Sequence, residues 1–283
     1  MQSELHSAAP ATPADSSLAG ALIGTPWRRR ALLRRLIRRD ILGRYRGSMA
    51  GLAWSLLQPL LMLAVLTVVF SDLLGMRWGV ANETRADFAL MLFVGLILHG
   101  FLGECLTRAP SLVVGNPNFV KKVVFPLELL PWVSVGAALF HAVASIAAWI
   151  IIAALCGRAV PWTIVFLPIV AAPLALVALG LSWLLAATAV YLRDVAQTTG
   201  LLTTALLFLS PVFYSAATVP PRYRPLLDLN PLTIPIEEAR RVMLAGEPPD
   251  FGRLAIHAAA ALGVALIGLW WFQRTRRGFA DVL

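Results

Sequence analysis

The residues that could carry catalysis or bind a nucleotide form no recognisable site in this sequence. Lys121 and Lys122 are its only lysines, and they follow Val120 instead of the glycine-rich loop of a G-x-x-x-x-G-K-[ST] motif. The patterns H-E-x-x-H, C-x-x-C and G-x-S-x-G are absent, and the four histidines are widely spaced: His6, His99, His141 and His257. We therefore expect no catalytic residue, no metal site and no cofactor in this chain.

Three ionisable side chains fall inside long apolar stretches, where a charge is costly. His99 and Glu104 lie in the stretch 88–107, and His141 lies in 129–156. A charge at the centre of a bilayer costs ~2.5–3.5 kcal/mol even on mild scales, so such residues suggest a functional site. Stripes of small and polar residues also let membrane helices pack closely. Packing and function both stay open for these three side chains.

The apolar stretches themselves predict an all-α, polytopic membrane protein. Of the 283 residues, 59% are hydrophobic and only 14% are charged, which excludes an ordinary soluble domain. Several stretches are long enough for a helix to cross the ~30 Å hydrocarbon core at ~1.5 Å per residue. Six spans are predicted, at about 48–71, 88–107, 129–156, 162–191, 195–214 and 251–272.

The distribution of basic residues predicts the orientation. Nine arginines lie between Arg28 and Arg46, and three more lie between Arg274 and Arg277. An even number of spans places both termini on one side, and the excess of arginine makes that side cytoplasmic. The same rule accounts for the net charge of +9, so nucleic-acid binding is not expected.

The segment 28–46 predicts an amphipathic helix in the inner membrane interface. Leu33, Ile37 and Tyr45 share one side of that helix, and arginines occupy most of the rest. Binding to anionic lipids and docking of a cytoplasmic partner would each explain the arginines. The preceding residues 1–26 are rich in Ala, Ser and Pro, and we expect a disordered tail without a cleavable signal peptide.

The fifth stretch is unusual because it is short. The predicted helix has only about 16 residues before Ser210-Pro211, where proline removes an amide donor and should break it. A short amphipathic helix is predicted after it, with Asn230 as its cap and Gly246 as its end. We expect the segment after the fifth span to be re-entrant or to lie on the outer surface; an ordinary exposed loop is the alternative.

An ordered set of short motifs resembles the ABC-2 type permeases that export polysaccharides. The resemblance covers nearly the whole chain beyond residue 26, and Gln58 stands where many relatives have asparagine. The motifs, in order, are the residues Arg39, Asp40, Arg44, Tyr45, Arg46, Gly51, Trp54, Gln58 and Pro59, followed by VKKVVFPLELLP (120–131), YLRDV (191–195), SPVFYS (210–215), LNPLT (229–233) and FADVL (279–283).

This resemblance implies one ABC-2 transmembrane domain over 27–283, in the bacterial cytoplasmic (inner) membrane. It implies a homodimer that works with two copies of a separate ATP-binding cassette subunit, which binds ATP and Mg²⁺. The substrate would be a lipid-linked polysaccharide, such as O-antigen or teichoic acid, moved outward through the dimer among membrane lipids. The chain itself would be a transporter subunit and not an enzyme.

The resemblance also assigns roles to residues of this chain. Those implied to contact the ATPase subunit are Arg38, Arg39, Asp40, Arg44, Arg46, Asn116, Phe119, Lys121 and Lys122. Those implied to line the conduit are Trp54, Gln58, Phe70, Thr203 and Phe208. Those implied to form the outer gate are Ser210, Pro211, Phe213 and Tyr214.

Two other classes of protein remain as alternatives. A proton-coupled secondary transporter would use acidic or histidine relays, for which His99 and Glu104 are the candidates, but the two halves of the chain show no matching repeats. A membrane-embedded glycan enzyme would need convergent carboxylates, and only Glu237-Glu238 could begin such a site.

Overall fold

A computed structural model describes residues 20–46, 51–78, 83–120 and 125–283, and all its regular elements in these ranges are helices. The predicted tail 1–26 lies mostly outside the described residues, as do Lys121, Lys122 and the start of the first predicted span. Five helices are long and apolar enough to cross a membrane: Trp54–Leu73, Arg85–Arg108, Leu129–Leu155, Trp162–Tyr191 and Phe251–Val282.

These long helices match the predicted spans closely. The first consists of α3 (Trp54–Thr67) and a π-helical turn, Val68–Leu73. The second and third are α4 (Arg85–Arg108) and α7 (Leu129–Leu155). The fourth joins a short 3-10 turn, Trp162–Phe166, to α8 (Leu167–Tyr191), and the last begins with α12 (Phe251–Thr275) and ends in α13 (Phe279–Val282).

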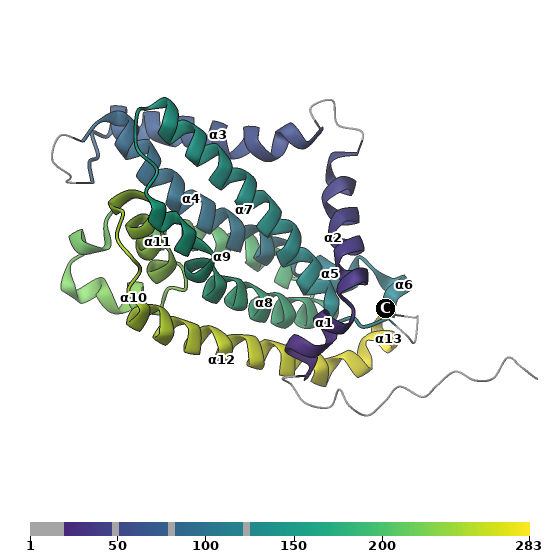
Figure 1. Ribbon diagram of the computed structural model, residues 1–283. Helices are drawn as coiled ribbons and strands as arrows, with labels where there is room; N and C mark the ends of the chain where they lie inside the picture. Colours follow the sequence, from purple (N-terminus) through teal and green to yellow (C-terminus); the bar gives the residue numbers. More distant parts are fainter. Residues whose placement is uncertain (1–19, 47–50, 79–82, 121–124) are drawn as a thin grey trace, which may run out of the picture.

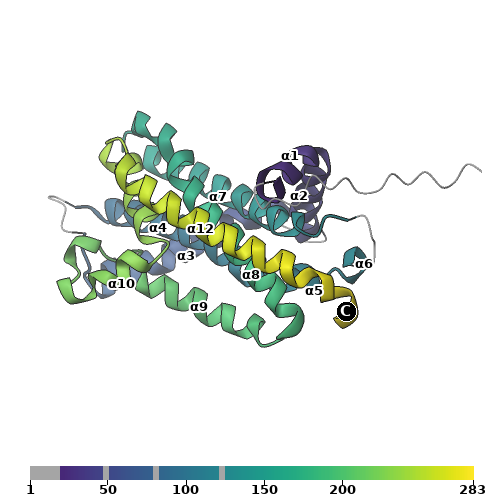
Figure 2. The same cartoon turned by 90° about the horizontal axis from the view of Figure 1, so that it is seen from below.

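The fifth predicted span is the short helix α9 (Val195–Leu209). Its 15 residues reach only about 22 Å, less than the ~30 Å hydrocarbon core. It ends at Ser210, as the Ser-Pro pair predicts. Figure 2 shows α9 running from the end of α8 toward the short helix α10 (Arg224–Leu229).

The predicted interface helix is present as α1 (Thr25–Arg28) and α2 (Arg30–Tyr45). Its apolar side packs on α7, where Ile37 lies so close to Gly136 that a Cβ there would overlap the isoleucine side chain. Figure 1 shows α2 steeply inclined to α3, at the end of the bundle that also holds the C terminus. This arrangement matches a helix lying along the membrane surface beside both ends of the described chain.

The tightest crossing in the bundle joins α8 and α12. A Cβ on Gly180 would lie 2.5 Å from the carbonyl oxygen of Val264, and one on Gly268 would overlap the carbonyl of Gly180. Small residues of this kind let membrane helices approach until their backbones touch. The two glycines therefore fix the position of the last span against the centre of the bundle.

Residues at the opposite end fold as a series of short helices. After α10, helix α11 (Thr233–Arg240) continues into a π-helical turn, Arg241–Ala245, which ends at Gly246 with a left-handed φ of 72°. The predicted end at Gly246 is confirmed, whereas the predicted start is wrong by two residues, since the helix begins at Thr233 instead of Pro231. Asn230 caps a turn instead, since its side chain accepts a hydrogen bond from the Leu232 amide at 2.9 Å.

Candidate functional site

A polar cluster joins the end of α2 to α4 and α7. The guanidinium of Arg44 forms an ion pair with Glu104, whose other carboxylate oxygen lies 2.8 Å from Nδ1 of His141. The Tyr45 hydroxyl lies 3.0 Å from Nε2 of the same histidine. Beside this group, Nη2 of Arg108 lies 2.7 Å from both carboxylate oxygens of Asp40. Two ion pairs therefore attach α2 to α4.

His141 has polar contacts at both ring nitrogens. Its Nδ1 lies 2.8 Å from a Glu104 oxygen and 3.3 Å from Nη1 of Arg44, and the shorter contact with the carboxylate favours a proton on Nδ1. Nε2 then has a free lone pair that accepts from the Tyr45 hydroxyl. Burial raises the pKa of Tyr45, which keeps the phenol protonated and able to donate. The cluster is thus a continuous chain of hydrogen bonds from α2 to α7.

This cluster forms one wall of a polar cavity of about 480 Å³ between α3, α4, α7 and α9. Gln58 and Thr203, two of the five predicted conduit residues, line it together with His99. Nε2 of His99 lies 3.0 Å from the Thr203 carbonyl oxygen, and a Cβ on Gly103 would lie 2.8 Å from the Thr203 methyl. The histidine and glycine thus hold α9 against α4 at this depth.

The other three predicted conduit residues do not line the cavity. Trp54 and Phe208 are 45% and 59% exposed on α3 and α9, and Phe70 stacks on Phe213 with 4.5 Å between ring centroids. Two further tryptophans within the predicted spans, Trp149 and Trp183, are fully buried and donate to backbone carbonyls, which excludes them from contact with a substrate.

The predicted outer-gate residues are gathered in one turn after α9. Ser210, Pro211 and Phe213 are buried, and the Asn230 side chain donates to the Ser210 hydroxyl at 3.0 Å. The Tyr214 hydroxyl donates to the Leu209 carbonyl oxygen at 3.0 Å. The turn is therefore held to the short helices that follow it and to the end of α9.

Arg240 organises this turn, although it was not among the predicted gate residues. Its guanidinium donates to the carbonyl oxygens of Pro211 (2.6 Å), Val212 (2.9 Å) and Met91 (3.2 Å), and it lies 4.1 Å from the Trp78 ring centroid. Burial lowers its pKa to about 9, so it stays charged at neutral pH. One sequence feature could have indicated this role: Arg240 follows the apolar Ile236 by four residues, which places both side chains on the same face of α11.

Residues predicted to contact an ATPase subunit lie at the α2 end of the bundle. Arg38, Arg39 and Arg46 are exposed, whereas Asp40 and Arg44 form the ion pairs described above. Two short helices, α5 (Ser111–Val114) and α6 (Pro117–Val120), complete this region.

The loop side of this region is attached to α2. The guanidinium of Arg39 lies 5.7 Å from the Phe119 ring centroid, and that ring stacks on Phe125. The Asn116 amide donates to the Leu112 carbonyl oxygen at 3.0 Å. The α2 helix and the α5–α6 loop therefore form one continuous surface.

Glu237 and Glu238, the acidic pair considered for a glycan enzyme, both bind other residues of the chain. Glu237 forms an ion pair with Arg253 at 2.8 Å. Glu238 has a side chain only 2% exposed and accepts from the Asp250 amide at 2.8 Å. Among the described residues, no three His, Cys, Asp or Glu side chains are grouped as metal ligands would be.

The five long apolar helices define a multi-pass helical membrane protein. Comparison with known families identifies it more closely: residues 31–244 match the ABC-2 type transporter family, and the chain belongs to that family. The predicted resemblance is thereby confirmed. Membership implies a membrane subunit of an ABC transporter that works with a nucleotide-binding partner.

Curated relatives match over most of the chain. It is 27% identical to the O-antigen export system permease protein RfbA of Myxococcus xanthus, over 89% of this chain and 95% of the relative. Two proteins of the same name from Klebsiella pneumoniae are 23% and 24% identical, each over 87% of this chain and 92% of the relative.

Proposed function

We propose that this chain is the permease subunit of an ATP-driven exporter that moves a lipid-linked polysaccharide outward across the bacterial cytoplasmic membrane. The observation that carries the proposal is the attachment of α2 to α4 by the Asp40–Arg108 and Arg44–Glu104 ion pairs, next to a polar cavity at membrane depth. The O-antigen export names of the relatives support the choice of substrate class.

The ion pairs give a route for mechanical coupling. An ATP-binding subunit on the cytoplasmic side would dock on the exposed arginines of α2 and on the α5–α6 loop, and would itself hold ATP and Mg²⁺. Movement of α2 would then displace α4 directly, because a partly buried, hydrogen-bonded ion pair resists separation. The Arg39–Phe119 contact would make the helix and the loop move together.

The conduit in this proposal lies between two copies of the chain. Most of α3 and α9 is exposed, including the apolar side chains of Leu61, Val65, Leu201 and Phe208. These two helices flank the cavity lined by Gln58 and Thr203, so dimerisation on this side would enclose a polar path. α9 would provide a short sixth crossing, and the Arg240-bound turn of Ser210, Pro211, Phe213 and Tyr214 would gate its outer end.

A proton-coupled secondary transporter is the second candidate, and a specific observation favours it. Glu104 and His141 are hydrogen-bonded at membrane depth, as a proton relay requires. Arg44 also binds Glu104, which favours a permanently ionised carboxylate over one that exchanges protons. We therefore rank this candidate below the ATP-driven exporter.

Co-purification tests the exporter proposal. The neighbouring reading frames would be searched for a Walker A protein, which would be expressed with the chain, and a complex of two copies of each is expected. Arg39→Glu with Phe119→Ala should abolish the complex, whereas Arg274→Glu, at an exposed arginine near the end of α12, should leave it intact. A chain that never binds such a protein, or a complex unaffected by the double variant, would contradict the proposal.

A further inference from the structure

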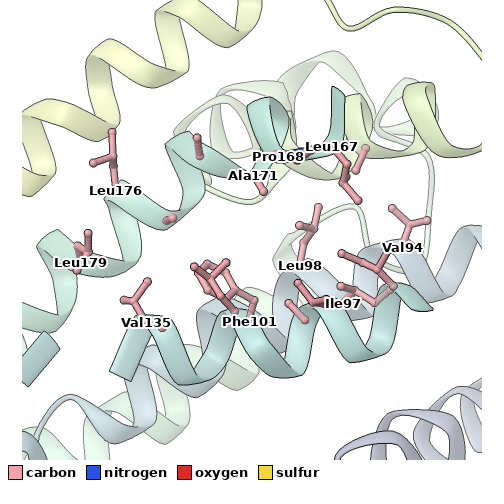
Figure 3. Close-up of a pocket in the computed structure, with 18 of the residues that line it drawn as sticks. Val94, Ile97, Leu98, Phe101, Val135, Leu167, Pro168, Ala171, Leu176 and Leu179 are labelled. Carbon is pink, nitrogen blue, oxygen red and sulfur yellow. The ribbon is translucent and has the colours of Figure 1, made fainter. Parts of the chain in front are cut away.

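A second cavity, distinct from the polar one, is an apolar groove of about 910 Å³ between α7 and α8, with α4 as its floor. Figure 3 shows its walls, with Val135 and Leu179 near one end, Phe101 in the middle and Val94 and Leu167 near the other. The α7 wall is a single helix face spaced by three or four residues: Trp132, Val135, Gly136, Leu139, Ala142, Val143, Ile146 and Ile150.

Small side chains create the groove. Ala171, Ala172 and Ala175 form much of the α8 wall, and their short side chains leave the space between α7 and α8 unfilled. Val143 on the opposite wall remains 62% exposed. The hydrocarbon core contains no water to fill an open groove between spanning helices, and an empty one would lose dispersion contacts along its whole lining. An apolar occupant would restore these contacts.

The inner end of the groove has a distinct charge. Leu33 and Ile37 of α2 close it, and Ile37 packs over Gly136. Arg34 and Arg38 follow these two residues directly on α2, and both are exposed. Neither arginine forms an ion pair with any acid in the described ranges. A hydrocarbon groove that ends beside two free arginines matches a lipid with an anionic headgroup.

We propose that this groove binds one acyl chain of an anionic phospholipid of the inner leaflet, whose phosphate contacts Arg34 and Arg38. An acyl chain reaches about half of the ~30 Å hydrocarbon core, so it fills the half of the groove nearest α2, up to Phe101. The bound lipid touches α2, α4, α7 and α8 together. It thereby fixes α2 on the bundle by a contact independent of the two ion pairs.

The proposal depends on membrane insertion and not on polysaccharide export, so either can fail without the other. The test uses the full chain in lipid nanodiscs, with a phosphatidylglycerol that carries a photoreactive group on one acyl chain. Crosslinks are expected on α4, α7 and α8 residues of the inner half of the groove. Ala175→Phe, which fills the groove, should remove them, whereas Ala147→Phe on an exposed, non-lining position of α7 should not.

A separate pair of variants tests the contact between the lipid headgroup and the two arginines. Arg34→Gln with Arg38→Gln should lower the preference for phosphatidylglycerol over phosphatidylcholine by about tenfold. The matched control, Arg274→Gln with Arg277→Gln, removes the same charge from another exposed arginine pair and should leave the preference unchanged.

Three results would overturn the proposal. These are groove crosslinks that persist in Ala175→Phe, equal labelling of the wild-type chain by the two lipids, and recovery of a polyprenyl lipid or a second copy of the chain as the occupant. If Ala175→Phe does not fold, competition between the two lipids on the wild-type chain decides alone.

Discussion

Nη2 of Arg108 in α4 lies 2.7 Å from both carboxylate oxygens of Asp40 in α2. The two residues are 68 positions apart in the chain, and their side chains are each about one-quarter exposed. Hydrogen bonds to charged groups contribute roughly 1.5–3 kcal/mol. This contact therefore holds the interface helix to a spanning helix. It belongs to one network with the Arg44–Glu104 pair, since Arg44 also lies 3.9 Å from Asp40 and Arg108 lies 3.8 Å from Glu104.

Breaking the Asp40–Arg108 pair should uncouple ATP hydrolysis from export. Asp40→Asn is expected to lower the polysaccharide exported per ATP hydrolysed by about tenfold, since a loss of ~1.4 kcal/mol changes an equilibrium tenfold. The hydrolysis rate and membrane insertion should change little. Equal export by Asp40→Asn and wild type would contradict the coupling role.

Neutralising Glu104 should destabilise the polar cluster. Glu104→Gln removes the carboxylate nearest to Arg44, which keeps only Asp40 at 3.9 Å, and replaces the acceptor of the His141 Nδ1 proton, at an expected cost of about 1–3 kcal/mol. Thermal unfolding of the detergent-purified chain measures the effect as a lower midpoint. Glu247→Gln is the control because its pair with Arg241 is largely exposed. Equal midpoints for the two variants would show that the cluster has no stabilising role.

Removing Arg240 should release the turn after α9. Arg240→Met leaves three backbone carbonyl oxygens without this donor, and each unpaired buried group costs about 1–3 kcal/mol. We expect a lower unfolding midpoint and faster protease cleavage between residues 210 and 230. Arg240→Lys should recover only part of the stability because one ammonium cannot match the planar fork of donors.

The next residue provides the control for Arg240. Arg241 pairs at the surface with Glu247, 3.1 Å away, so Arg241→Met should stay close to wild type. A turn that is equally protected in Arg240→Met and Arg241→Met would exclude Arg240 as the residue that positions it.

Adding one methyl group at the α8–α12 crossing should prevent normal packing. Gly268→Ala places a Cβ on the Gly180 carbonyl, so the last span has to move away from the bundle. Gly263→Ala is the matched control on the same helix, because nothing lies within 4 Å of its added Cβ. We expect a large fall in the yield of monodisperse protein for the first variant and wild-type yield for the second, measured by size-exclusion chromatography.

Local signals predicted most of the helices. The uncharged runs gave the positions of the spans, the Ser210-Pro211 pair gave the end of α9, and Gly246 gave the end of the turn after α11. Each of these features depends on residues within a few turns of one another. The start of α11 was predicted wrongly because Asn230 caps a tight turn first, and only the folded backbone distinguishes the two uses of that side chain.

The contacts that define the candidate site join distant parts of the sequence. Glu104 and His141 were recognised as unusual, but their common contact with Arg44 depends on where α2 crosses the bundle. No role was predicted for Arg240, since a single sequence does not show which buried carbonyls lie opposite. The apolar groove could not be predicted either. A helix face that packs against another helix and a helix face that lines an open groove have the same pattern of apolar residues.

Transport by reconstituted vesicles tests the central claim most directly. Inverted proteoliposomes that contain this chain and the ATP-binding subunit with which it co-purifies would be given ATP, and uptake of a labelled lipid-linked O-antigen into the lumen would be measured. We expect uptake that requires both proteins and hydrolysable ATP, and that collapses in Asp40→Asn while hydrolysis continues. Uptake by this chain alone, driven by a proton gradient without ATP, would contradict it.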